Sequence, residues 1–212
     1  MSKEASGSET GTHVTARGEQ IGLDRLIFFS DAVFSIAMTL LALELRLPHD
    51  SANLVNANLT HALLGLWKQY LAFATSFVVI GAFWLAHHRK FRHIRRYDRP
   101  LLWINLLLLM SVAFVPFPTA VLSDYGNRTA TIFYALSMLI TALLTAALWW
   151  HATRGHRLVD ADLSPRVIRR ELVRALALAG VFLVSIGIAF LNADLAKFTW
   201  LLLLVVLSIV SR

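Results

Sequence analysis

The chain has 212 residues, of which 57% are hydrophobic, and its mean hydropathy is +0.62. This composition excludes an ordinary soluble domain, which faces water on all sides, and favours a membrane protein. The net charge of +7 could indicate nucleic-acid binding, but the basic residues lie in short segments between apolar runs, which suits membrane topology better. The absence of cysteine excludes disulfides, thiolate metal sites and cysteine nucleophiles.

The N-terminal segment, residues 1–22, is rich in Ser, Thr, Gly and Glu and has almost no large apolar side chains. Because such a segment buries too little surface to offset the entropy of ordering, we predict a disordered cytoplasmic tail. It lacks the basic start and apolar core of a cleavable signal peptide, so the first spanning helix is expected to direct insertion. Residues 23–212 are predicted to form one membrane domain.

Six apolar runs follow, each close to the roughly 20 residues that a helix needs to cross a bilayer. They lie at about 25–47, 63–87, 101–122, 130–151, 169–191 and 194–211. Backbone groups in lipid must pair internally, so the predicted fold is an all-α integral membrane protein with six transmembrane helices. Within the third run, "VPFPT" (115–119) removes two backbone donors and predicts a break or kink.

The loops predict the orientation of the chain in the membrane. Arginine and lysine are concentrated in 87–99 and 153–170, whereas the other three connections have almost none. Because cationic loops stay in the cytoplasm, both termini are predicted to be cytoplasmic. An even number of spans agrees with this orientation.

The first run carries two acidic residues. Asp31 lies one to two turns inside its cytoplasmic end, where an unpaired charge costs on the order of 3 kcal/mol. Candidate partners at the same depth are Arg25, Ser30, Trp84, His87 and His88. Two interpretations remain open: Arg25 and Asp31 fix helix ends together as a buried latch, or Asp31 acts directly in function. Glu44 lies near the outer end and is expected to face water.

Apolar residues of the first run share one face. At about 100° per residue, Ile36, Leu40 and Leu43 form a stripe that Leu47 continues, with Thr39 about 60° away. Asp31 lies about 140° from this stripe. An aliphatic stripe on a membrane helix is typical of a lipid-facing or packing surface. These patterns alone predict no more than a polytopic membrane protein.

Motifs for enzyme chemistry are absent. The chain has no phosphate-binding loop, zinc-protease motif or serine-hydrolase motif, so no enzyme activity is predicted. His87, His88 and His93 could suggest a metal site, but the neighbouring arginines and Lys90 would repel a cation. A basic cytoplasmic loop is the favoured interpretation, and weak, non-specific binding of anionic lipid is the alternative.

Three segments resemble a known family. "RLIFFSD" (25–31) with its continuation "AVFSIAMTLLALEL", "FWLAHHRKF" (83–91) and "LLWINLLLLMSVAFVPFPTAVL" (101–122) are similar to the first three helices of the transmembrane protein 175 family. This family comprises endosomal and lysosomal potassium channels and their prokaryotic homologues. The likeness covers about 24–122, and later helices match mainly in number and hydropathy. The single six-helix unit implies a prokaryotic-type homotetramer.

The resemblance implies a potassium-selective, leak-type cation channel of the plasma membrane, with the first helix of each subunit lining a central pore. Ile36 matches the narrowest hydrophobic ring, Leu40 and Leu43 continue the constriction, and Thr39 matches a hydroxyl layer that potassium passes. No cofactor is implied. Potassium ions, membrane lipids and further copies of the chain are the expected partners.

The remaining motif residues are implied to lock the first helix against the second and third helices. They are Arg25, Phe29, Ser30, Asp31, Trp84, one of His87 and His88, and Asn105. The sequence does not distinguish between the two histidines. Two alternatives to a potassium channel remain: a proton channel or proton-coupled transporter in which Asp31 or Glu44 titrates, and a membrane scaffold without conduction.

Overall fold

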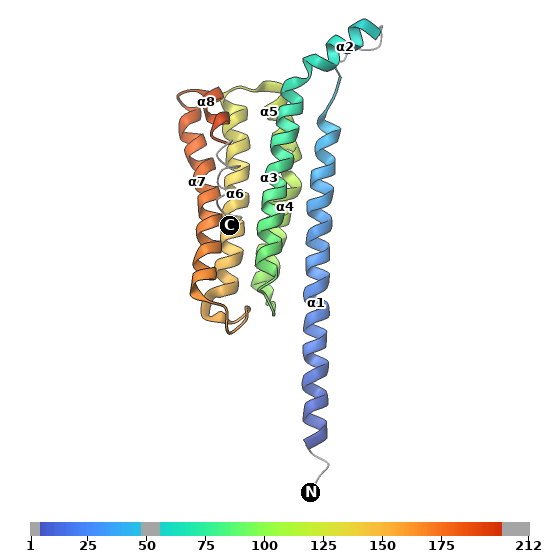
Figure 1. Cartoon of the computed structure of the whole chain (residues 1–212), viewed down its shortest axis with the longest axis vertical. Helices are drawn as coiled ribbons and strands as arrows, with labels where there is room; N and C mark the ends of the chain where they lie inside the picture. Colours follow the sequence, from blue (N-terminus) through green and yellow to red (C-terminus); the bar gives the residue numbers. More distant parts are fainter. Residues whose placement is uncertain (1–4, 48–55, 201–212) are drawn as a thin grey trace.

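The structure, a computed structural model, describes residues 5–47 and 56–200. In chain order the elements are α1 (Ala5–Leu40), the 3₁₀ turn η1 (Leu41–Glu44), α2 (Asn56–Gly65), α3 (Trp67–Phe91), α4 (Arg99–Phe114), α5 (Pro116–Tyr125), α6 (Arg128–Thr153), the 3₁₀ turn η3 (Arg154–His156), α7 (Pro165–Ala189) and α8 (Ala193–Phe198). The long helices run side by side, and α2 bends away from them at one end (Figure 1).

Five helical segments in this part of the chain are long and apolar enough to cross a membrane. They are Gln20–Glu44, Trp67–Phe91, Arg99–Tyr125, Arg128–His156 and Pro165–Ala189. The prediction of an all-α membrane protein is confirmed, and these segments coincide with the first five predicted spans. Most of the sixth predicted span, 194–211, lies outside the described residues. Its described start contributes to the short helix α8.

Helix α1 begins at Ala5, inside the segment 1–22 that composition predicts to be disordered. The disorder of segment 1–22 remains a prediction. Once the following span is helical, each added residue needs only helix propagation, which costs far less than nucleating a new helix. The N-terminal part of α1 consequently extends past the other helices as a continuation of the first span (Figure 1).

The predicted break in the third span is confirmed. Helix α4 ends at Phe114 and α5 begins at Pro116, with Val115 between them. Because Pro116 and Pro118 have no N–H, the regular hydrogen-bond ladder cannot continue across them. The Val115 N–H instead donates to the carbonyl of Val112 at 3.1 Å, a tighter 3₁₀-type bond.

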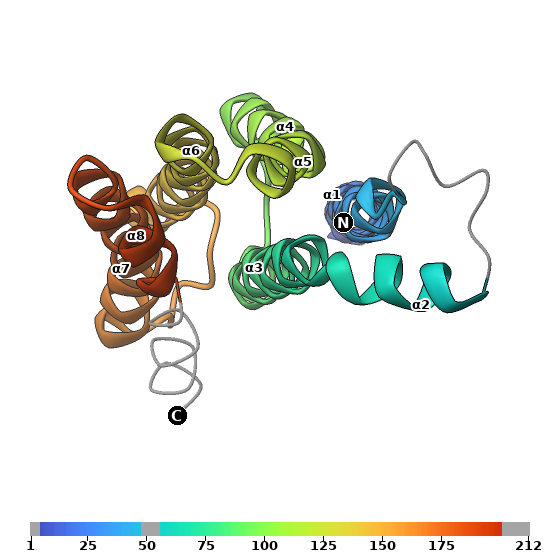
Figure 2. The same cartoon turned by 90° about the horizontal axis from the view of Figure 1, so that it is seen from above.

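Viewed from above, α6 and α7 lie at one edge of the bundle and α1 at the opposite edge, with α3 and α4–α5 between them (Figure 2). Helix α6 carries alanines and threonines along its buried face, including Ala135, Ala142 and Thr145. Such small residues allow a neighbouring membrane helix to approach closely. The pair α6 and α7 is therefore the most closely packed part of the fold.

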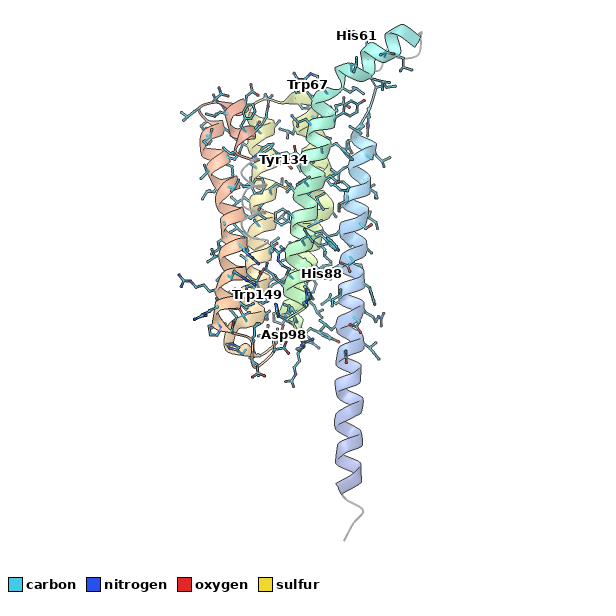
Figure 3. The ribbon with its side chains drawn as sticks, in the orientation of Figure 1. His61, Trp67, His88, Asp98, Tyr134 and Trp149 are labelled. Atoms are coloured by element: carbon cyan, nitrogen blue, oxygen red, sulfur yellow. The ribbon has the colours of Figure 1, made fainter. Side chains whose placement is uncertain are left out.

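The two arginine-rich loops meet at one end of the bundle. The backbone N–H groups of Arg95 and Arg96 donate to the carbonyl of Leu158 at 2.8 and 3.2 Å, and Arg95 Nε donates to Asp160 Oδ1 at 2.7 Å. Asp98 in the first loop caps α4 through the Leu101 N–H at 2.8 Å. Asp98 and Trp149 lie towards this end, while His61 and Trp67 mark the other (Figure 3).

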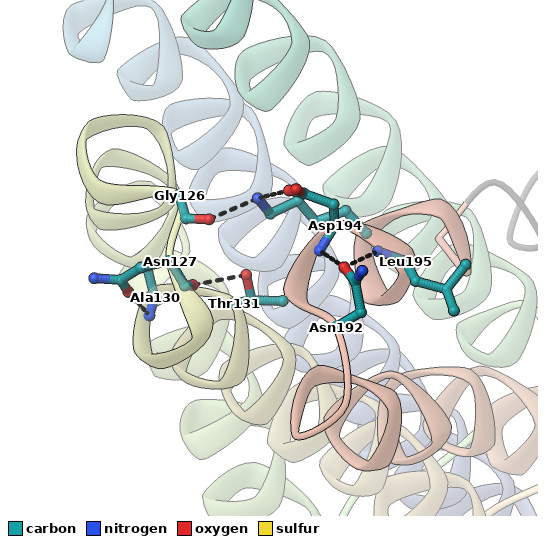
Figure 4. A network of polar contacts seen from close by, with 8 residues as sticks. Gly126, Asn127, Ala130, Thr131, Asn192, Asp194 and Leu195 are labelled. Carbon is teal, nitrogen blue, oxygen red and sulfur yellow. Dashed lines mark hydrogen bonds and ion pairs between the residues drawn. The ribbon is translucent and has the colours of Figure 1, made fainter.

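A polar network at the other end joins the α5–α6 turn to α8 (Figure 4). Lys197 Nζ donates to the carbonyl of Gly126 at 2.7 Å and to Asp194 Oδ1 at 2.9 Å. Gly126 ends α5 with a φ of 55°, a left-handed conformation that favours glycine. Asn192 caps α8 by accepting from the Asp194 and Leu195 N–H groups. This network fixes where the chain leaves α7.

Candidate functional site

One face of α1 is packed against the bundle. Phe34 and Ala37 are each only 1% exposed, and Ser30 and Leu41 are completely buried. Helix α1 makes these contacts with α3 and α4 and, through η1, with α5. The packed face therefore combines large apolar groups with one buried hydroxyl, and it fixes the rotation of α1 about its own axis.

The opposite face of α1 is open. Ile36 is 57% exposed, and Phe29, Leu40 and Leu43 are also exposed although all are apolar. Thr39 lies beside them, and its hydroxyl donates to the carbonyl of Ile36 at 2.8 Å. A hydroxyl has one donor and two acceptor lone pairs, so this bond leaves Thr39 with only acceptor capacity towards the open side. An oxygen that can only accept is suited to a cation.

Leu43 continues the stripe of Ile36 and Leu40 beyond the end of α1. It does so through 3₁₀ geometry rather than through the α-helical geometry used for the prediction. Helix α1 ends at Leu40 and the chain tightens into the 3₁₀ turn η1. Side chains three residues apart eclipse in a 3₁₀ helix, so Leu43 follows directly below Leu40. After η1 the backbone is extended at Leu45, so the predicted helical position of Leu47 does not hold.

A buried chain of hydrogen bonds joins α1, α3 and α4. His87 Nε2 lies 2.9 Å from Asn105 Oδ1, and Asn105 Nδ2 donates to Ser30 Oγ at 3.1 Å. Ser30 in turn donates to the carbonyl of Leu26 at 2.8 Å. Each donor and acceptor is consistent if His87 carries its proton on Nε2. His87 Nδ1 is then a buried acceptor without a hydrogen-bond partner among the described atoms.

Of the two adjacent histidines, His87 is therefore the one that packs on the first helix. Its ring stacks on Phe91 with centroids 4.2 Å apart and lies 5.5 Å from the Phe34 ring. His88 is exposed on the neighbouring face of α3, with its ring 5.7 Å from that of Trp84. The direction of each side chain depends on how α3 is rotated in the bundle, which the adjacent pair in the sequence does not specify.

Asp31 bonds to Trp84, one of its candidate partners, and not to Arg25. Trp84 Nε1 donates to Asp31 Oδ1 at 2.8 Å, which joins α3 to α1 one turn away from the His87 chain. Arg25 is exposed and makes no ion pair with Asp31 or with another described side chain. Six residues apart on a helix, Arg25 and Asp31 point about 120° away from each other. Within one chain Arg25 and Asp31 therefore do not pair with each other, and the packing role of Arg25 remains a prediction.

The sequence analysis did not predict a buried charged cluster around Glu171. Glu171 of α7 is 2% exposed and lies 3.8 Å from Lys90 Nζ and 3.5 Å from Arg89 Nε of α3, and Arg174 donates to its other oxygen. Lys90 itself is 1% exposed. The predicted loop 87–99 thus begins inside α3. An acidic residue among the arginines of α7 was the available signal, but its partners lie some 80 positions earlier.

Other candidate sites do not form. Among the residues whose side chains are described, no group of three His, Cys, Asp or Glu side chains could hold a metal ion. His93 lies beside Trp149, away from His87 and His88. Glu44 is partly exposed at the end of η1, 3.9 Å from Arg46 Nη2. The open face of α1 and the polar groups behind it are the candidate functional site.

Comparisons with known proteins point to one family. The family model for the endosomal/lysosomal potassium channel TMEM175 matches residues 25–116. A protein from Streptomyces collinus named as a potassium channel is 41% identical over 177 residues, which cover 81% of this chain and 84% of that protein. The human endosomal/lysosomal proton channel TMEM175 is 28% identical over 171 residues, covering 69% of this chain but 34% of the human protein.

A solved structure agrees with the fold. The crystal structure of a lysosomal potassium-selective channel TMEM175 homologue from Chamaesiphon minutus superposes with a TM-score of 0.79 and is 34% identical. The match covers 91% of this chain and all of that chain. The similarity therefore extends over the whole helical arrangement rather than only over the segment that carries α1, α3 and α4.

Proposed function

This chain belongs to the TMEM175 family of membrane ion channels, and from this premise we propose that it is a potassium-selective, leak-type channel. Potassium ions would be the permeant species, and no cofactor is required. The observation that carries this proposal is the open face of α1. Apolar side chains and an acceptor-only hydroxyl face away from the chain's own bundle, while Ser30 and Asp31 are hydrogen-bonded to groups of the bundle.

Four copies of the chain would surround a central pore, each contributing six spanning helices, with 194–211 as the last. Helix α1 lies at the edge of the bundle, so copies can bring their α1 helices together without rearranging the other helices (Figure 2). In this assembly Ile36, Leu40 and Leu43 would form successive rings around the ion path. Lipid would cover the remaining apolar surface of each subunit.

The chemistry of the stripe accounts for selectivity in this proposal. A narrow ring of four Ile36 side chains excludes water, so an ion must shed part of its hydration to pass, and modest widening admits water and current. Four Thr39 oxygens, each with its proton directed to the Ile36 carbonyl, would replace part of the lost hydration. Potassium loses water more readily than sodium, which favours potassium.

The residues behind α1 would hold this geometry. Ser30, Asn105 and His87 fix the rotation of α1 against α3 and α4, and Trp84 with Asp31 adds a second contact. In this role Asp31 is a positioning group outside the ion path. Arg25, exposed in the single chain, would then be available to a neighbouring subunit or to lipid head groups.

The channel would lie in the plasma membrane with both termini in the cytoplasm. Support comes from the two arginine-rich loops, which meet at the same end of the bundle. The start of α1 projects beyond that end (Figure 1). Cationic segments remain on the cytoplasmic side during insertion.

Ion flux from liposomes that contain the purified protein tests the proposal. We expect potassium efflux that exceeds sodium efflux, and we expect Ile36→Asn to increase total flux and reduce the preference, because a polar ring no longer excludes water. Leu107→Asn, an exposed apolar position on α4, is the matched control and should leave flux unchanged. Absence of potassium flux from folded protein, together with no effect of Ile36→Asn, would contradict a channel.

A proton channel is the second candidate, because the human relative is named as one. In that case a carboxyl group such as Asp31 or Glu44 would titrate during transport. A pH-sensitive dye inside the liposomes distinguishes the two functions. Asp31→Asn should abolish proton flux if Asp31 carries protons, whereas a positioning role predicts weaker assembly with unchanged ion preference in the remaining channels. A non-conducting scaffold would show neither flux.

A further inference from the structure

Helix α7 presents a second open face, at the opposite edge of the bundle from α1 (Figure 2). Val173, Leu176 and Val184 are each about half exposed, and Ala177 is exposed between them. At about 100° per residue these four side chains lie along one side of the helix. A side chain added at Gly180, on the same side, would meet no atom within 4 Å. The stripe is therefore apolar and open at Gly180.

Three arginines begin the same stripe. Arg166, Arg169 and Arg170 are exposed and share the side of α7 that carries Val173. No described residue forms an ion pair with any of the three. Glu171, the residue after Arg170, lies on the opposite side of α7 and is engaged by Lys90, Arg89 and Arg174. The three positive charges are thus unneutralised in this part of the structure.

Their position makes the lack of a counter-charge unfavourable. Helix α7 starts at Pro165 and has no acidic residue in its first turn, so the positive end of its dipole lies beside the three arginines. Three other arginines at this end have partners: Arg95 pairs with Asp160, Arg157 with Asp98, and Arg154 lies over the Trp150 ring. Because Arg166, Arg169 and Arg170 share one side of α7, an external anion there would relieve the repulsion among all three.

We propose that this face of α7 binds an anionic phospholipid of the surrounding leaflet. The phosphodiester lies among Arg166, Arg169 and Arg170, whose planar guanidinium groups can each donate two hydrogen bonds to phosphate oxygens. One acyl chain follows Val173, Ala177 and Val184 into the membrane. The rise from Val173 to Val184 is about 16 Å, close to half of the roughly 30 Å hydrocarbon core, which is the depth of one leaflet.

A lipid fits this face better than a soluble phosphate or polyanion because the charged group continues directly into the apolar stripe. A soluble anion would use the arginines and leave the stripe unoccupied. The site requires only that α7 spans the membrane, so it is independent of the ion path proposed along α1. Loss of lipid binding and loss of conduction can therefore be measured separately.

Thermal unfolding of the purified full-length protein in non-ionic detergent, followed by tryptophan fluorescence, tests the site. Phosphatidylglycerol should raise the unfolding midpoint more than phosphatidylcholine with the same acyl chains. The triple variant Arg166→Gln, Arg169→Gln, Arg170→Gln should weaken the apparent phosphatidylglycerol affinity by about tenfold or more, since each basic residue near an anionic surface contributes to attraction. Equal stabilisation of the parent by both lipids would overturn the proposal.

The charge-matched control is Arg92→Gln, Arg99→Gln, Arg154→Gln, which removes three exposed arginines from the same end on other elements. It should retain phosphatidylglycerol affinity within about twofold. An equal loss in both triple variants would mean diffuse attraction to surface charge and would overturn a site on α7. If the glutamine triple variant does not fold, the corresponding lysine triple variant keeps the charges but loses the planar fork, and we expect an intermediate loss of affinity.

Two further measurements separate a lipid from a soluble anion. Glycerophosphate and inorganic phosphate, added at a hundredfold excess over the effective phosphatidylglycerol concentration, should not reproduce the stabilisation. Ala177→Phe fills the stripe without changing charge and should weaken phosphatidylglycerol binding severalfold. Full protection by glycerophosphate, or unchanged lipid binding in Ala177→Phe, would overturn the placement of the acyl chain.

Discussion

The two faces of α1 have the reverse polarity of a surface helix in a soluble protein. Its polar groups, Ser30 and Asp31, are directed towards the bundle and bonded there, whereas Ile36 and its apolar neighbours face outward. In water this arrangement would be unfavourable, because apolar surface would be exposed while polar groups were buried. The difference shows that the outward face is completed by surroundings beyond the single chain, and the inward face fixes its direction.

The largest expected effect comes from removing an aromatic ring from the packed face of α1. Phe34→Ala leaves a cavity among buried side chains and should lower the free energy of unfolding by about 3 kcal/mol. Phe28→Ala, on the same helix at a position 71% exposed, is the matched control and should change it by less than about 0.5 kcal/mol. Denaturant unfolding in detergent measures both. Similar losses in the two variants would mean that the packed face is wrongly assigned.

Asn105→Ala should have the next largest effect, because it leaves His87 without its hydrogen-bond partner and removes one bond from Ser30. An orphaned buried polar group costs about 1–3 kcal/mol. Ser111→Ala, on the same helix, removes only a bond to the carbonyl of Leu108 and serves as the control, with an expected loss below about 0.5 kcal/mol. If Asn105→Ala unfolds like the parent protein, the hydrogen-bond chain does not stabilise α1.

Thr39→Val sharpens the comparison at the open face, because it keeps the side-chain shape and removes the hydroxyl. Unfolding should be unchanged, since the Thr39 hydroxyl bonds only within α1. The potassium-to-sodium flux ratio should fall severalfold, corresponding to about 1 kcal/mol for one neutral hydrogen-bonding group. Thr60→Val on α2 is a control outside the proposed path. A ratio unaffected by Thr39→Val would assign selectivity to another layer.

The smallest effect is expected far from α1, at the two arginine-rich loops. The hydrogen bond from Arg95 lowers the pKa of Asp160 below its usual value. The pair therefore stabilises the fold fully above the unfolded-state pKa near 4, and this contribution is lost as the pH falls through the folded-state pKa. Both side chains are well exposed, so the contribution is small.

Unfolding midpoints of the parent and Asp160→Asn, compared between about pH 6 and pH 3, measure this contribution. The difference between the two proteins should shrink towards the acid end. A difference that stays constant with pH would mean that the ion pair adds no stability.

Much of the fold follows from local patterns. Long apolar runs specified five spans because backbone pairing in lipid leaves a helix as the simplest solution, and the two prolines of "VPFPT" broke the third span by chemistry that acts locally. The stripe of Ile36 and Leu40 also followed from helical periodicity. The apolar pattern alone favoured lipid contact or packing, and only the resemblance to a channel family directed it towards a pore.

The remaining details depend on tertiary structure. Helical periodicity does not say which of His87 and His88 faces α1, because that depends on how α3 is rotated against its neighbours. The buried contact of Lys90 with Glu171 joins residues 81 positions apart, so nothing local indicates it. Of the candidate partners of Asp31, Arg25 could already be set aside from the sequence, because the two residues diverge by about 120° on one helix.

Silver-ion block of a single introduced thiol tests the central claim most directly, because the parent chain has no cysteine to react. Ag⁺ is a monovalent cation that binds thiolates and can enter a potassium path. In liposomes, Ile36→Cys should lose potassium flux on addition of Ag⁺, whereas the parent and Leu107→Cys should not. Unblocked flux through Ile36→Cys, after thiol labelling in detergent has confirmed that the cysteine is present and reactive, would contradict an ion path along the open face of α1.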